Sequence, residues 1–125
     1  MARARIDDIS GRDAVAAWAR AEASDDAVDR PTLALAVRYT LQLLAELSPG
    51  GSVEVRVPPF GAVQCIEGPR HTRGTPPNVV EMDAPSWMQL ATGRADWEAV
   101  RATGRVHASG QRADLTGHVP VIDAR

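Results

Sequence analysis

The fold is decided by one stretch near the end of the chain, residues 78–110, with the sequence NVVEMDAPSWMQLATGRADWEAVRATGRVHASG. It begins with a short apolar run from Val79 to Met82. Two short segments follow, each opened by an aspartate and closed by a glycine, and a second short run ends at Gly110. Aspartate is a preferred residue at helix starts and glycine a preferred residue just past helix ends. The order therefore predicts strand, helix, helix and strand.

The preceding residues predict helices first and strands afterwards. Ser10 is placed to cap a first helix, and the polar, acidic stretch from Ala23 to Asp29 is typical of a linker. Pro31 opens a second helix whose apolar residues recur at helical spacing up to Leu47. After Gly50 and Gly51 apolar residues recur at every second position, which is typical of a strand. We expect this helix to pack on a sheet built from Ser52–Val57, Ala62–Glu67, Val79–Met82 and Arg105–Ser109.

Two parts of the chain carry a family resemblance. Residues 90–94 and 104–110, LATGR and GRVHASG, resemble the end of the sterol carrier protein-2 (SCP2) family. Residues 56–64, RVPPFGAVQ, look like a bacterial sterol-carrier-like branch of unassigned function. The resemblance implies an α+β fold with an apolar cavity, in which helices cover one face of an about five-stranded, mainly antiparallel sheet. The length of 125 residues predicts a single domain over residues 1–125. We expect an N-terminal helix and linker in 1–30 and the sterol-carrier-like core in 31–125.

The composition excludes several classes of function. A net charge of −2 gives no basic footprint for nucleic acid. All 14 basic residues are arginine, which excludes a Schiff-base lysine and the lysine of a phosphate-binding loop. The single Cys65 has no disulfide partner, and residues 1–8 show no secretory signal. The most apolar stretch, Leu33 to Leu47, is too short to span a membrane. We expect a cytoplasmic protein without stable membrane insertion.

No set of residues indicates catalysis. His71, His107 and His118 lack the spacing of a metal site. Cys65 lies in an apolar strand, where a cysteine is usually inert. Asp83 is expected to cap a helix, as is Asp96 at the start of the next one. We therefore expect no enzyme activity, no metal and no cofactor.

The stretch from Arg70 to Thr75 is the richest in polar chemistry. Arg70, His71 and Arg73 offer donors that suit a carboxylate or phosphate headgroup. The alternative is a solvated surface loop. Both interpretations remain open at the level of sequence.

The leading hypothesis is a non-enzymatic binding or carrier module for a small apolar or amphipathic ligand, such as a lipid, fatty acid or sterol-like molecule. We expect the site between the sheet and the residue 83–93 helix, with Arg70, His71 and Arg73 near its mouth. Its expected walls are Phe60, Ile66, Val80, Met82, Trp87, Leu90 and Val106. One alternative is an accessory domain or subunit, since the chain also resembles the C-terminal module of thiol-dependent maleylpyruvate-type isomerases. Another is a ligand-free dimerisation domain, and the sequence leaves a homodimer open.

Overall fold

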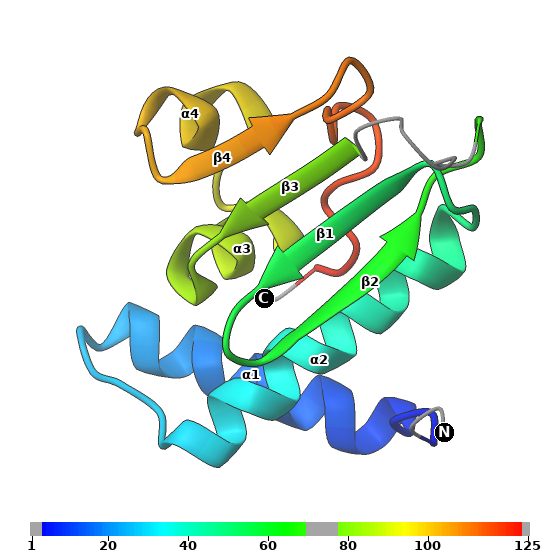
Figure 1. The fold of residues 1–125 in the computed structure, drawn as a ribbon. Coiled ribbons are helices and arrows are strands. Elements are labelled where there is room, and N and C mark those ends of the chain that lie inside the picture. Colours follow the sequence, from blue (N-terminus) through cyan, green and yellow to red (C-terminus); the bar gives the residue numbers. More distant parts are fainter. Residues whose placement is uncertain (1–3, 70–77, 124–125) are drawn as a thin grey trace.

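The computed structural model describes residues 4–69 and 78–123, which form four helices and four strands (Figure 1). The chain order of these elements begins with two helices and places two further helices between the last two strands. Their bounds are α1 Asp8–Ala23, α2 Arg30–Leu47, β1 Val53–Val57, β2 Gly61–Cys65, β3 Asn78–Met82, α3 Ala84–Ala91, α4 Trp97–Ala102 and β4 Val106–Ser109.

The strands form one mixed sheet in the order β2-β1-β3-β4. Val55 of β1 lies opposite Val63 in the antiparallel pair with β2 and opposite Val80 in the parallel pair with β3. The β3–β4 pair is antiparallel. The structure confirms the α+β class, although the described residues contain four strands where about five were expected. The parallel pair makes the sheet mixed and was not predicted.

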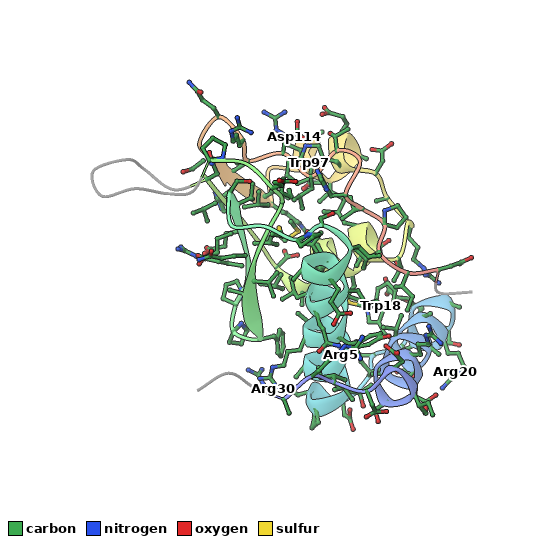
Figure 2. All side chains as sticks on the ribbon, turned by 90° about the vertical axis from the view of Figure 1, so that its right-hand side faces the viewer. Arg5, Trp18, Arg20, Arg30, Trp97 and Asp114 are labelled. Carbon is green, nitrogen blue, oxygen red and sulfur yellow. The ribbon has the colours of Figure 1, made fainter. Side chains whose placement is uncertain are left out.

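All four helices lie on one side of this sheet (Figure 2). Successive side chains of a strand point to opposite faces of the sheet, so only alternate residues face the helices. Val53, Val55 and Val57 are buried, whereas Glu54 is half-buried and Arg56 exposed. The sheet therefore keeps a polar face towards solvent and an apolar face towards the helices.

Helix α2 packs on the sheet as predicted, with Leu41 and Leu44 at most 1% exposed. Asp29 caps it by accepting a hydrogen bond from the Thr32 amide at 2.9 Å. The cap predicted for α1 was wrong: Asp7 is the N-cap, and its carboxylate accepts from the amide of Ser10 at 2.9 Å. Asp7 stands one residue outside the first helical turn, where its side chain reaches an amide that the helix leaves unpaired.

The end of the described chain is irregular. From Gly110 to Asp123 it contains no helix or strand, yet Leu115 is fully buried. The amides of Val121 and Ile122 donate to the carbonyl of Ala91 at 2.9 and 3.2 Å. This segment therefore fastens to the end of α3. In the described parts of the chain, no helix has the length and apolarity needed to cross a membrane.

Candidate functional site

Four of the residues predicted to line a ligand site lie in the core. Val80, Trp87 and Leu90 are 0% exposed, and Met82 is 2% exposed. A space large enough for a water molecule would leave part of these side chains exposed. The structure therefore surrounds these four side chains with protein atoms.

A hydrogen bond explains how this region closes. The indole Nε1 of Trp87 on α3 donates to Oγ1 of Thr40 on α2 at 2.8 Å. The Thr40 hydroxyl in turn donates to the carbonyl of Ala36 in its own helix, at 2.7 Å. A buried indole N–H needs a partner, so this contact fixes α3 against α2.

The remaining predicted residues lie in several places. Phe60, half-buried, follows β1, and Ile66, half-buried, follows β2 with φ of 67°. The Ile66 backbone is held on both sides, since its amide donates to Ser48 at 2.7 Å and its carbonyl accepts the Ser52 amide at 3.0 Å. Val106, half-buried, lies opposite Met82 on β4. Arg70, His71 and Arg73 lie outside the described residues, so their role at a mouth stays a prediction.

The structure shows an open groove elsewhere, between α2 and the edge strand β2. We call it the α2–β2 groove. Its volume is about 790 Å³, within the range of ordinary small-molecule sites. Of the predicted site residues that the structure describes, only Phe60 is among those that line it. The lining residues are Ala4, Arg5, Ile6, Leu35, Arg38, Leu41, Gln42, Ala45, Glu46, Phe60, Gly61, Ala62 and Val63.

One wall of the groove is the short segment of residues 4–6, which we call the N-terminal strap. Its Ile6 backbone exchanges two hydrogen bonds with the Gln42 side chain, at 2.8 and 2.9 Å. Arg5 donates to both carboxylate oxygens of Glu46, at 2.6 and 2.9 Å. Gln42 and Glu46 are one helical turn apart on α2, so they hold the strap along the helix.

The carboxylates around the strap are held ionised. A hydrogen bond from Arg5 lowers the pKa of Glu46 below its usual value. The pKa of Asp8 is also lowered, first by the Tyr39 hydroxyl, which donates at 2.7 Å, and then by Arg5 at 3.2 Å. Burial raises the pKa of Tyr39, and its bond to Asp8 raises it further. At neutral pH the strap is therefore fastened by charge-assisted hydrogen bonds.

The opposite end of the groove is organised around Phe60. Arg38 Nε donates to the Phe60 carbonyl at 2.8 Å. The guanidinium of Arg30 lies over the Phe60 ring, 5.3 Å from its centroid, in a cation–π contact. Figure 2 shows Arg30 at the N-terminal end of α2, with Arg5 beside the same helix.

The chemistry of the groove suits binding of an amphipathic molecule. Apolar side chains from α2, β2 and the strap line it, while Arg38, Gln42 and Glu46 supply polar atoms. Sequence reasoning missed these three, although they recur every fourth residue in a largely apolar helix. That spacing places them on one face and was a readable signal.

Other reactive residues are placed away from the groove lining. Cys65 is fully buried, and burial raises the pKa of its thiol to about 11, so the thiol is protonated at neutral pH. Ser48 Oγ and His118 Nδ1 share a hydrogen bond of 2.8 Å, which ties the C-terminal segment to the end of α2. In residues 4–69 and 78–123, no three residues of the His, Cys, Asp or Glu type stand together as a metal site. His107 is exposed on β4.

The mixed sheet with helices on one face, and the order of elements in residues 78–110, form the α+β arrangement that the sterol-carrier resemblance implies. The sequence pattern of the bacterial SCP ortholog family matches residues 29–121, about three quarters of the chain. The chain therefore belongs to the bacterial SCP ortholog family. No curated protein matches it.

Proposed function

We propose that this protein is a non-enzymatic binding or carrier module for a small amphipathic ligand, and that the α2–β2 groove is its site. The observation that carries the proposal is an open groove of about 790 Å³ with apolar walls and a few polar side chains. Membership of the bacterial SCP ortholog family supports a carrier role.

The energetics favour a molecule with an alkyl tail. Leu35, Phe60 and Val63 present apolar surface in the groove, and all three are partly exposed without a ligand. Covering such surface contributes about 25 cal/mol per Å², and each buried methylene about 0.8 kcal/mol. Affinity is therefore expected to rise about fourfold per added methylene until the groove is full.

The test is calorimetric titration with octanol, decanol and dodecanol. Wild type is expected to bind all three, with affinity increasing along the series. Ala45→Trp places a large ring among the lining residues and is expected to weaken dodecanol binding at least tenfold.

Ala17→Trp is the matched control, because Ala17 is half-buried like Ala45 but lies on α1, away from the groove lining. It is expected to bind as wild type does. Equal losses in both variants, or no binding of any alcohol to wild type, would contradict the assignment of this groove.

A further inference from the structure

The two ends of the α2–β2 groove differ in charge. At the strap end, Arg5 is neutralised by Glu46 and Asp8, with nitrogen–oxygen distances of 2.6 and 3.2 Å. At the Phe60 end stand two arginines, Arg30 and Arg38. Neither guanidinium forms an ion pair with a carboxylate of residues 4–69 or 78–123. The groove therefore has a positive end and a neutralised end.

Arg38 has donors left over after its contact with the Phe60 carbonyl. Its side chain is half-buried, and the bond from Nε to the Phe60 carbonyl at 2.8 Å fixes its orientation. The two terminal nitrogens remain, and they carry four of the five N–H donors of a guanidinium. Within the described chain they have no hydrogen-bond partner. A half-buried cation gains most from an anion that can bind both nitrogens.

Arg30 adds charge at the same end. The Phe60 ring holds its guanidinium at 5.3 Å from the ring centroid, although Arg30 is exposed at the start of α2. Phe60 therefore carries one arginine on its ring and another on its carbonyl. Because Arg30 is exposed, its attraction for an anion is screened by salt more strongly than that of half-buried Arg38.

We propose that the ligand is an anionic amphiphile whose carboxylate or phosphate headgroup binds Arg38, assisted by Arg30, while its tail extends along α2 towards Ala45. This inference rests on the proposed function of the groove and gives it a direction. The headgroup enters at the Phe60 end because the strap end already contains its own carboxylates. A cationic headgroup meets repulsion at Arg38, and a neutral one leaves the guanidinium without an anion.

The first experiment compares headgroups on one tail by calorimetry: dodecanoate, dodecyl phosphate, dodecanol and dodecylamine. The expected order places both anions about tenfold tighter than dodecanol, as one charge-assisted interaction provides, with dodecylamine weakest. The advantage of the anions is expected to shrink as salt is raised.

The second experiment uses variants. Arg38→Gln is expected to weaken dodecanoate about tenfold and to leave dodecanol unchanged, with Arg30→Gln weakening dodecanoate by a smaller factor. Arg38→Lys keeps the charge and is expected to restore part of the preference for dodecanoate. Arg20→Gln is the control, since Arg20 lies on α1 on the far side of the helices from Arg30 in Figure 2.

Each outcome decides a different point. Equal binding of dodecanoate and dodecanol by wild type overturns the headgroup site while leaving the groove as an amphiphile site. Equal weakening of both ligands by Arg38→Gln shows that Arg38 only positions Phe60, which also overturns the proposal. Acetate and inorganic phosphate are titrated as anions without a tail. If they bind as tightly as the long-chain anions, the site is one for free anions, which also overturns the proposal. Absence of binding by every amphiphile removes both this inference and the proposed function.

Discussion

Helix α2 has two sides that contrast in how they meet the rest of the protein. Towards α3, Thr40 meets Trp87 through a hydrogen bond of 2.8 Å, and both residues are 0% exposed. Towards β2 and the strap, Arg38, Gln42 and Glu46 stand beside an open groove. The same helix therefore builds a closed core on one side and one wall of an open groove on the other.

The contrast teaches that apolar character alone does not separate a closed core from an open groove. Leu41 lines the groove although it is only 1% exposed, and Leu90 lies in the closed core. The open side differs in its polar side chains, which bind backbone groups of the strap and the turn instead of packing against another apolar layer. Long polar side chains keep such a surface hydrated because their heads need partners.

The largest expected effect is on the closed side. Trp87→Ala removes a fully buried ring and is expected to lower the free energy of unfolding by about 4 kcal/mol. Phe60→Ala on the open side is expected to cost only about 1 kcal/mol, because Phe60 is half-buried and its neighbours already face solvent. Denaturant unfolding of the two variants measures the difference. Equal costs would abolish the distinction between the two sides.

Replacing a smaller side chain by tryptophan on each side of α2 tests whether that side has room for a large ring. Leu90→Trp inserts a ring into the closed side and is expected to cost about 2 kcal/mol. Ala45→Trp adds a ring in the groove and is expected to change stability by less than about 0.5 kcal/mol. Thermal or denaturant unfolding provides both values. A stable Leu90→Trp protein would show that the core has unfilled space beside α3.

The hydrogen bond between Thr40 and Trp87 allows a finer test of the closed side. Thr40→Val keeps the shape but leaves the indole N–H without its acceptor, at an expected cost of about 1.5 kcal/mol. In a Trp87→Phe background that donor is absent, so the cost of Thr40→Val is expected to fall. A double-mutant cycle in denaturant isolates the coupling. Costs that simply add would mean that the hydrogen bond contributes nothing measurable.

Much of the fold was predictable because it depends on local rules. The switch of period after Gly50 located the strands, and the aspartates Asp83 and Asp96 mark the starts of α3 and α4 as expected. The parallel pairing of β1 with β3 was missed. Strand order depends on contacts between segments far apart in sequence, and no local pattern encodes it.

The site was less predictable for a related reason. The sequence shows which residues are apolar, but a cavity exists only where packed elements leave space between them. Arg5 and Glu46 are 41 positions apart, and so the strap that walls the groove could not be read from spacing. The resemblance implied a site between the sheet and α3, but in the structure Trp87 of α3 is hydrogen-bonded to Thr40 and the space is closed.

The smallest expected effect concerns the strap. It distinguishes the open side of α2 from the closed side, because only the strap is expected to respond to mild acid. The pKa values of Asp8 and Glu46 are lowered in the folded protein, chiefly by the hydrogen bonds from Tyr39 and Arg5 respectively. A lowered carboxyl pKa stabilises the fold at pH values above the ordinary carboxyl range, and that contribution is lost as pH falls through the lowered pKa. Acidification from about pH 5 to about pH 2 is therefore expected to loosen the strap.

The amide of Ile6 reports this loosening, because it donates to Gln42 at 2.8 Å. Its NMR signal and hydrogen exchange are expected to change over the acid range, while the buried Trp87 indole signal stays constant until global unfolding. In Glu46→Gln the strap is expected to be weaker already at neutral pH, and the remaining titration then belongs to Asp8 and to Asp7, whose pKa is lowered by the hydrogen bond from the Ser10 amide. An Ile6 signal that moves together with the Trp87 indole would mean that the strap and the core open as one unit, and that the wall of the groove is as firmly fixed as the closed side of α2.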